Sequence, residues 1–155
     1  MNELVYRNLS EDAKRQICAW KYGGEYDLYN LPSYEEMQVR QIGFMNPQRE
    51  KNYYGFWDES ILVGFVNILE EKEEVFIGIG VNPDLCNKHY GQRMLLITYE
   101  ISKKLYPDKP LYLEVRTWNI RAVKCYQKAE FRIDGQAYEL TTGIGTGTFY
   151  RMIRE

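Results

Sequence analysis

The stretch LEVRTWNIRAVKCYQKAEF, residues 113–131, decides how this chain folds. It begins as a largely apolar β-strand, and Asn119 then supplies a side chain that can cap a helix. The helix that follows carries Tyr126 about two turns from its start. Glu114 on the strand is a candidate base, and the phenol of Tyr126 is a candidate acid. Acyl transfer to an amine requires groups of both kinds.

Outward from this stretch, the hydrophobic pattern predicts alternating strands and helices. Strands are predicted at residues 3–8, 53–57, 61–69, 75–81, 111–117, 131–140 and 147–153. Helices are predicted from an N-cap at Ser10 to about Tyr22, from an N-cap at Ser33 onward, from Tyr90 until Pro107, and over 119–128. This order predicts an α/β fold with a mixed sheet and a right-handed crossover between parallel strands, flanked by antiparallel hairpins.

Composition limits the function classes. A chain of 155 residues fits a single domain, here predicted over residues 1–155. A net charge of -2 argues against nucleic acid as a partner. No apolar run approaches the roughly 20 residues of a membrane helix, and no signal segment opens the chain, so we expect a cytoplasmic protein with no membrane partner. Cys18, Cys86 and Cys125 have only His89 beside them, which predicts reduced thiols and no metal site.

The turn between Val81 and Tyr90 leads into the best helix of the chain. A helix start presents unpaired N–H groups and a partial positive charge, which suit a phosphate. Gly91 would let the backbone approach a ligand, and Lys88 and Arg93 add cations. On these residues alone, an ordinary polar loop is the favoured interpretation, and phosphate binding is the alternative.

Two segments together resemble the GNAT family of N-acetyltransferases, over roughly residues 53–153. The signature of the family before its central helix has three slots, held here by Cys86, His89 and Gly91, of which only Gly91 matches. The segment from Asn119 to Phe131 closely matches the second motif of the family. The resemblance implies a single GNAT-like domain, a central mixed sheet of six or seven strands and about four helices on both faces.

The resemblance also implies a function: transfer of an acetyl group from acetyl-CoA, the co-substrate, directly to a primary amine of a small molecule or peptide. The residues it places at the coenzyme are Ile79, Gly80, Val81, Cys86, Asn87, Lys88, His89, Tyr90, Gly91, Gln92, Arg93, Asn119, Ala122, Tyr126 and Lys128. An N–H near Val81 would hold the oxyanion. The pantetheine arm would pair with the free edge of this strand where it splays from its neighbour.

The resemblance assigns two catalytic roles. Tyr126 would protonate the departing thiolate, although a core tyrosine is the plain alternative. Glu114 would act as the base through a water, in a stretch similar to that of the ribosomal-protein N-terminal acetyltransferases. A Glu114 paired with a Lys or Arg on a neighbouring strand is an equally weighted alternative. Glu130 stands where the family commonly has glycine, so a left-handed conformation there would cost about 1 kcal/mol.

The acceptor is expected between a Tyr-rich loop, residues 22–34, and a loop at 141–147. Acidic residues near the first loop could attract a cationic amine: a peptide N-terminus, a polyamine, an aminoglycoside or another small amine. The glycines at 143–147 predict a turn, because no helix follows them as a nucleotide loop requires. The sequence leaves open a homodimer and, as the alternative function, a non-catalytic domain that binds or senses acyl-CoA.

Overall fold

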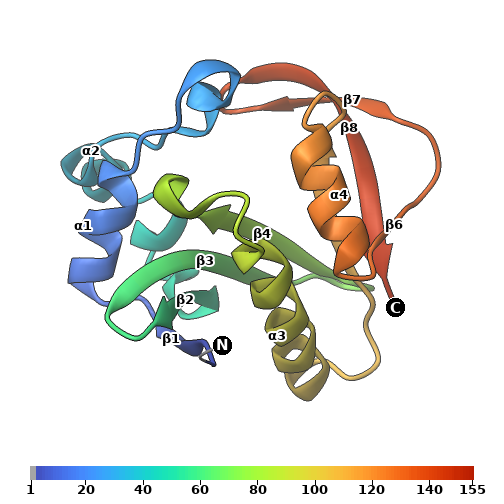
Figure 1. The fold of residues 1–155 in the computed structure, drawn as a ribbon, viewed down its shortest axis with the longest axis horizontal. Coiled ribbons are helices and arrows are strands. Elements are labelled where there is room, and N and C mark those ends of the chain that lie inside the picture. Colours follow the sequence, from blue (N-terminus) through green and yellow to red (C-terminus); the bar gives the residue numbers. More distant parts are fainter. Residues whose placement is uncertain (1–2) are drawn as a thin grey trace. The chain divides into compact units, whose positions relative to one another are not determined.

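The structure, a computed structural model, describes residues 3–155 and confirms the predicted α/β fold class (Figure 1). Its α-helices are α1 (Glu11–Ala19), α2 (Tyr34–Arg40), α3 (Tyr90–Leu105) and α4 (Ile120–Lys128). Its strands are β1 (Val5–Asn8), β2 (Tyr53–Asp58), β3 (Ile61–Glu70), β4 (Val75–Val81), β5 (Leu111–Arg116), β6 (Arg132–Ile133), β7 (Tyr138–Thr142) and β8 (Gly145–Arg154).

The strands follow the order β1-β2-β3-β4-β5-β8-β6, and β7 pairs with β8 beside this path. The eighth strand arises because the predicted strand 131–140 is two strands, β6 and β7. Gly135 lies between them with a φ of 77°, a left-handed conformation that an extended strand cannot contain. The turn predicted at 143–147 is present but shorter, because only residues 143–144 connect β7 to β8 and Gly145 already begins β8.

The chain forms two compact units: Met1–Asn67 with Ile79–Tyr90, and Ile68–Gly78 with Gly91–Glu155. Strands β3 and β4 contribute residues to both. Within residues 3–155, no helix has the length and apolar character needed to cross a bilayer. The three cysteines are free, as predicted.

In the first unit, β1, β2 and β3 form an antiparallel meander. The predicted helix caps are confirmed: the Ser10 side chain accepts from the Ala13 N–H at 3.1 Å, and that of Ser33 from the Glu36 N–H at 3.2 Å. A 3-10 helix, Gly24–Tyr29, occupies the predicted Tyr-rich loop. The core of this unit consists of Leu9, Ala13, Ile17, Cys18, Met37, Phe44, Trp57 and Leu62.

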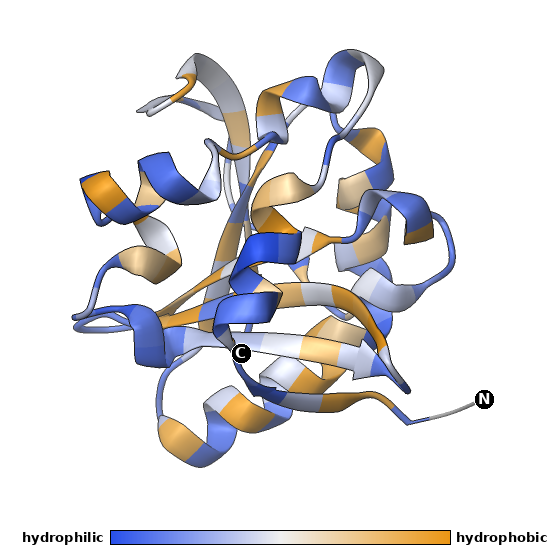
Figure 2. Ribbon diagram, turned by 90° about the vertical axis from the view of Figure 1, so that its left-hand side faces the viewer, coloured by the Kyte–Doolittle hydropathy of each residue, from blue (hydrophilic) through white to orange (hydrophobic). Residues whose placement is uncertain are grey.

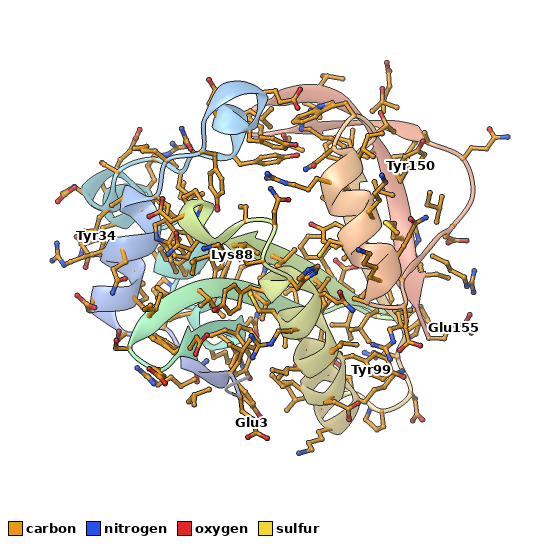
Figure 3. The ribbon with its side chains drawn as sticks, viewed as in Figure 1. Glu3, Tyr34, Lys88, Tyr99, Tyr150 and Glu155 are labelled. Atoms are coloured by element: carbon orange, nitrogen blue, oxygen red, sulfur yellow. The ribbon has the colours of Figure 1, made fainter. Side chains whose placement is uncertain are left out.

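In the second unit, β4 pairs with β5 in parallel, and β8 pairs with β5 antiparallel along six residues. Strand β8 lies between β5 and β6, so the α4 connection does not lead to a neighbouring strand. The helices contain both hydrophobic and hydrophilic residues (Figure 2), and along β5 buried residues alternate with half-buried ones from Leu111 to Val115. The Tyr99 hydroxyl of α3 donates to the Glu155 carbonyl beyond the end of β8 at 2.9 Å (Figure 3).

Helix α4 is capped at both ends by hydrogen bonds. At its start, the side chain of Asn119 accepts from the Ala122 N–H at 3.3 Å. At its end, the Phe131 N–H donates to the Tyr126 carbonyl and the Glu130 N–H to the Gln127 carbonyl, both at 3.0 Å. This pair of bonds is a Schellman motif, which requires a left-handed residue just past the helix. Glu130 takes that conformation with a φ of 73°, as expected from its position in a glycine slot.

Replacement of Glu130 by glycine is expected to stabilise the fold. Removing the left-handed strain gains about 1–2 kcal/mol, and the flexibility of glycine in the unfolded chain costs about 0.5–1 kcal/mol, so the net gain in unfolding free energy is about 0.75 kcal/mol, in a range of about 0–1.5 kcal/mol. Urea denaturation measures it. Glu130→Gln is the matched control, because it loses the ion pair with Arg154 but keeps the strained backbone. A Glu130→Gly protein less stable than the wild type would contradict this reading.

Replacement of Asn119 by alanine is expected to destabilise the protein by about 1 kcal/mol, because the first turn of α4 loses the acceptor for one of its N–H groups. Thermal or urea unfolding measures the loss. Asn119→Ser is the control, since a serine oxygen can cap the same helix, and it should retain more stability than the alanine variant. Equal stability of the two variants would rule out the cap as the source of the effect.

Candidate active site

Glu114 lies on a polar face of the sheet in the second unit. Along β5, Leu111, Leu113 and Val115 are buried on one face, so Glu114 and Arg116 share the opposite face. The Tyr138 hydroxyl of β7 donates to Glu114 Oε2 at 2.6 Å. Glu114 is therefore half-buried and held by a neutral donor.

Glu114 has no ion-pair partner within residues 3–155, which argues against the alternative that it forms a structural ion pair. Its cross-strand neighbour is Arg151 of β8, which has the right charge and position for such a pair. Arg151 instead binds two other carboxylates. It makes a bidentate contact with Glu74, and its Nε donates to Asp134 at 3.2 Å. No salt bridge within the described residues includes Glu114.

Tyr138 was not among the residues singled out from the sequence. Burial raises the pKa of its phenol, and the hydrogen bond to Glu114 raises that pKa further. Tyr138 therefore remains protonated around neutral pH and serves Glu114 as a donor. Twenty-four residues separate the two in the chain, and only the pairing of β7 with β8 and of β8 with β5 brings them together.

Four predicted coenzyme residues lie on or beside α4. Asn119 caps the helix through Ala122, while Tyr126 and Lys128 belong to its second half. The Gln92 Nε2 of α3 donates to the Lys128 carbonyl at 3.5 Å. This contact brings the first turn of α3, with Gly91 and Arg93, beside the last turn of α4. Seven of the predicted coenzyme residues, Gln92 included, therefore belong to the second unit.

The ladder between β4 and β5 ends early. It joins Val75 with Leu111 and Phe76 with Tyr112, and among the described residues of the second unit it includes neither Ile77 nor Gly78. Strand β5 nevertheless continues to Arg116. This is the local geometry that the predicted separation of the two strands requires. The oxyanion donor near Val81 stays a prediction.

The other predicted coenzyme residues lie in the first unit, at the end of β4 and in the segment that follows it. The Tyr22 hydroxyl donates to the Val81 carbonyl at 2.6 Å, a contact between the Tyr-rich segment and β4 that sequence spacing does not indicate. Asn82 fixes the strand end, because its N–H donates to the Val63 carbonyl at 2.8 Å and its side chain to the Leu62 carbonyl at 3.1 Å.

The segment before α3 contains two residues with left-handed backbone: Asn87 with a φ of 64° and His89 with a φ of 67°. His89 holds a slot in which the family has glycine, and the positive φ is the physical reason for glycine there. Asn87, Lys88 and His89 are all exposed (Lys88 is marked in Figure 3). Cys86 turns its thiol toward the Asn82 carbonyl, at 3.7 Å.

Two predicted coenzyme residues also have packing roles. A Cβ on Gly80 would overlap the ring of Phe65, so the close approach that this glycine permits is made by an aromatic side chain of β3. The Tyr90 hydroxyl donates to Asp58 Oδ2 at 2.6 Å and ties the start of α3 to the end of β2. Residues 3–155 contain no group of three His, Cys, Asp or Glu side chains able to hold a metal ion.

Comparison with solved structures supports this architecture, whereas none of the curated proteins compared matches the chain. An acetyltransferase of the GNAT family from Bacillus anthracis matches with a TM-score of 0.77 and 17% identity, over 99% of this chain and 95% of that one. A spermidine N-acetyltransferase from Vibrio cholerae, in complex with CoA and spermine, matches with a TM-score of 0.77 and 18% identity, over 98% and 95%. At such identities the likeness concerns the fold.

The sequence itself matches the family model described as the acetyltransferase (GNAT) family over residues 10–131, well over half of the chain. The match includes the segment before α3, all of β5 and all of α4. The predicted GNAT-like fold is thereby confirmed, and so is acetyl-CoA as the co-substrate. The chain belongs to the GNAT family and is an acetyl-CoA-dependent N-acetyltransferase.

Proposed function

We propose that the protein transfers an acetyl group directly to a primary amine, with Glu114 as the base through a water and Tyr126 as the acid. The observation that carries this proposal is the state of Glu114: a half-buried carboxylate that receives a hydrogen bond from Tyr138 and has no ion pair within residues 3–155. A neighbouring cation would disfavour proton transfer to a carboxylate, and no such ion pair is formed by Glu114 within the described residues.

The reaction imposes two proton transfers. An amine with a pKa of about 10 is protonated at neutral pH and must lose a proton before it attacks. Glu114 would receive that proton through a water. The departing sulfur must gain a proton or remain a thiolate, and Tyr126, on the helix capped by Asn119, would supply it. The acetyl group itself comes from acetyl-CoA.

The chain has residues suited to the diphosphate of the coenzyme. Helix α3 has 16 residues, so its start offers unpaired N–H groups and a partial positive charge. Lys88 is exposed beside that start, and Arg93 lies in the first turn. Two left-handed residues, Asn87 and His89, shape the approach. A helix start binds phosphate mainly through its backbone N–H groups, so the proposal does not depend on the side chain of Cys86.

The acceptor is a primary amine of a small molecule or a peptide. The similar fold of a spermidine N-acetyltransferase makes polyamines one of the first classes to test. Glu25 and Asp27 in the 3-10 helix, and Glu35 and Glu36 in α2, are exposed acids suited to attract cationic amines. An acceptor panel followed by thiol release from acetyl-CoA tests the proposed reaction directly.

Replacement of Tyr126 by phenylalanine is expected to lower kcat by about 10²-fold or more, because the leaving sulfur loses its proton donor. Titration calorimetry should give an unchanged affinity for coenzyme A. Tyr6→Phe is the control, since Tyr6 is an exposed residue of β1 that should tolerate the same chemical change. Unchanged turnover in Tyr126→Phe would rule out Tyr126 as the acid.

Replacement of Glu114 by glutamine is expected to lower kcat/KM at neutral pH by about 10²-fold or more, through loss of the base. The deficit should shrink as the pH rises toward the amine pKa of about 10, because the free amine then needs no base. The pH profile of kcat/KM measures this. Glu139→Gln, an exposed position on β7, is the control. A deficit that is constant across the pH range would identify Glu114 as a structural group.

A further inference from the structure

Arg116 of β5 is a buried cation without a carboxylate partner. The residue is 8% exposed, yet no salt bridge or side-chain hydrogen bond includes it among the residues that the structure describes. Its guanidinium carbon lies 4.8 Å from the centre of the Phe149 ring. A cation–π contact offsets only part of the cost of removing a charge from water. A buried cation of this kind is suited to an anion.

The other arginines of the same sheet region are neutralised. Arg151 binds Glu74 and Asp134, and Arg154 binds Glu130 at 3.0 Å. Even Arg132, on the exposed strand β6, has Glu155 at 2.5 Å. Among the described arginines of β5, β6 and β8, Arg116 is thus the one without a carboxylate partner, and it is two positions from the proposed base.

The guanidinium of Arg116 is also held in place. A Cβ added to Gly147 of β8 would overlap Arg116 Nη1, so the guanidinium packs directly on the backbone at that position. Phe149, the cross-strand partner of Arg116, supports it from the same strand. A charged group confined in this way loses little freedom when a ligand binds.

Arg116 and Glu114 form a charge pattern that a zwitterion would match. They share one face of β5, two residues or roughly 6–7 Å apart along the strand, and no ion pair joins them within the described chain. Tyr138 of β7 lies opposite Phe149 of β8, and its hydroxyl donates a hydrogen bond to Glu114. An amine close to Glu114 would present a nearby carboxylate to Arg116.

We infer that the acceptor carries a carboxylate near its reacting amine and that Arg116 binds this carboxylate. The acceptor class is then an amino acid or another aminocarboxylate. A polyamine, which has only positive charge, would leave Arg116 unpaired. This inference rests on the proposed function and narrows its acceptor.

The experiment compares sets of acceptors that differ only at the carboxylate: α-amino acids, their carboxamides and the corresponding decarboxylated amines, with spermidine as a separate probe. Purified protein and acetyl-CoA are used, and kcat/KM is measured for each. The wild type is expected to prefer the carboxylate over the carboxamide by at least about tenfold, which is the size expected of a charge-assisted contact. Most of the difference should lie in KM.

Two variants test the assignment to Arg116. Arg116→Gln should lose the preference for the carboxylate while leaving kcat/KM for the carboxamide within about threefold, and Arg116→Lys should recover part of it. Gly147→Ala should lose the preference too, because the added methyl displaces the guanidinium while leaving its charge. Arg132→Gln is the matched control at an exposed, paired arginine.

The outcomes separate this inference from the proposed function. Acetylation of amines with no preference for a carboxylate, or a preference for spermidine, would overturn the inference and leave the proposed function standing. An equal loss on all acceptors in Arg116→Gln would make Arg116 a structural residue and also overturn it. If no amine is acetylated, the proposed function fails and the inference with it. Should the variants not fold, the preference of the wild type alone decides.

Discussion

The antiparallel ladder between β5 and β8 is the constraint on which the functional face of the second unit depends. It pairs six residues of β5, from Leu111 to Arg116, whereas the parallel ladder with the residues of β4 that belong to the second unit joins two. Because opposite residues of an antiparallel pair share a face, the ladder decides the surroundings of Glu114 and Arg116. It places Arg151 across from the first and Phe149 across from the second. Displacement of β8 by one residue would turn Arg151 and Phe149 to the other face and change the neighbours of both β5 residues.

The same ladder determines which charged side chains of this face lie opposite one another. Arg151 could neutralise Glu114, but the loops that carry Glu74 and Asp134 supply competing carboxylates. A guanidinium with two carboxylate partners has its donors engaged, and this holds the pKa of Arg151 above its ordinary value. The hydrogen-bond donor to Glu114 is therefore the neutral phenol of Tyr138. The two charged residues of β5 nearest the proposed chemistry both lack an ion pair within the described residues, which is the opposite of what stability alone would favour.

Two glycine slots of the family contain other residues here without a change in backbone. His89 before α3 and Glu130 after α4 both have left-handed conformations, with φ values of 67° and 73°. Each conformation costs free energy for a residue with a side chain, so the surrounding structure must impose it. At Glu130 the imposing structure is visible as the Schellman bonds that end α4. The poor match of His89 to the family signature therefore concerns the side chain, while the backbone shape persists.

The sequence by itself determined the α/β class, the strand-helix-strand order in the middle of the chain, the caps at Ser10, Ser33 and Asn119, and the family. These features depend on residues close together in the chain, through hydrophobic period, capping side chains and contiguous motifs. It also indicated Glu114, but not whether a cation would neutralise it. Only the tertiary structure decided that, because the partners come from β7, β8 and distant loops. The same holds for the splitting of residues 131–140 into two strands, for the insertion of β8 beside β5, and for the burial of Arg116 against Gly147. Such contacts follow from strand pairing over long separations, and local sequence patterns do not specify which strands meet.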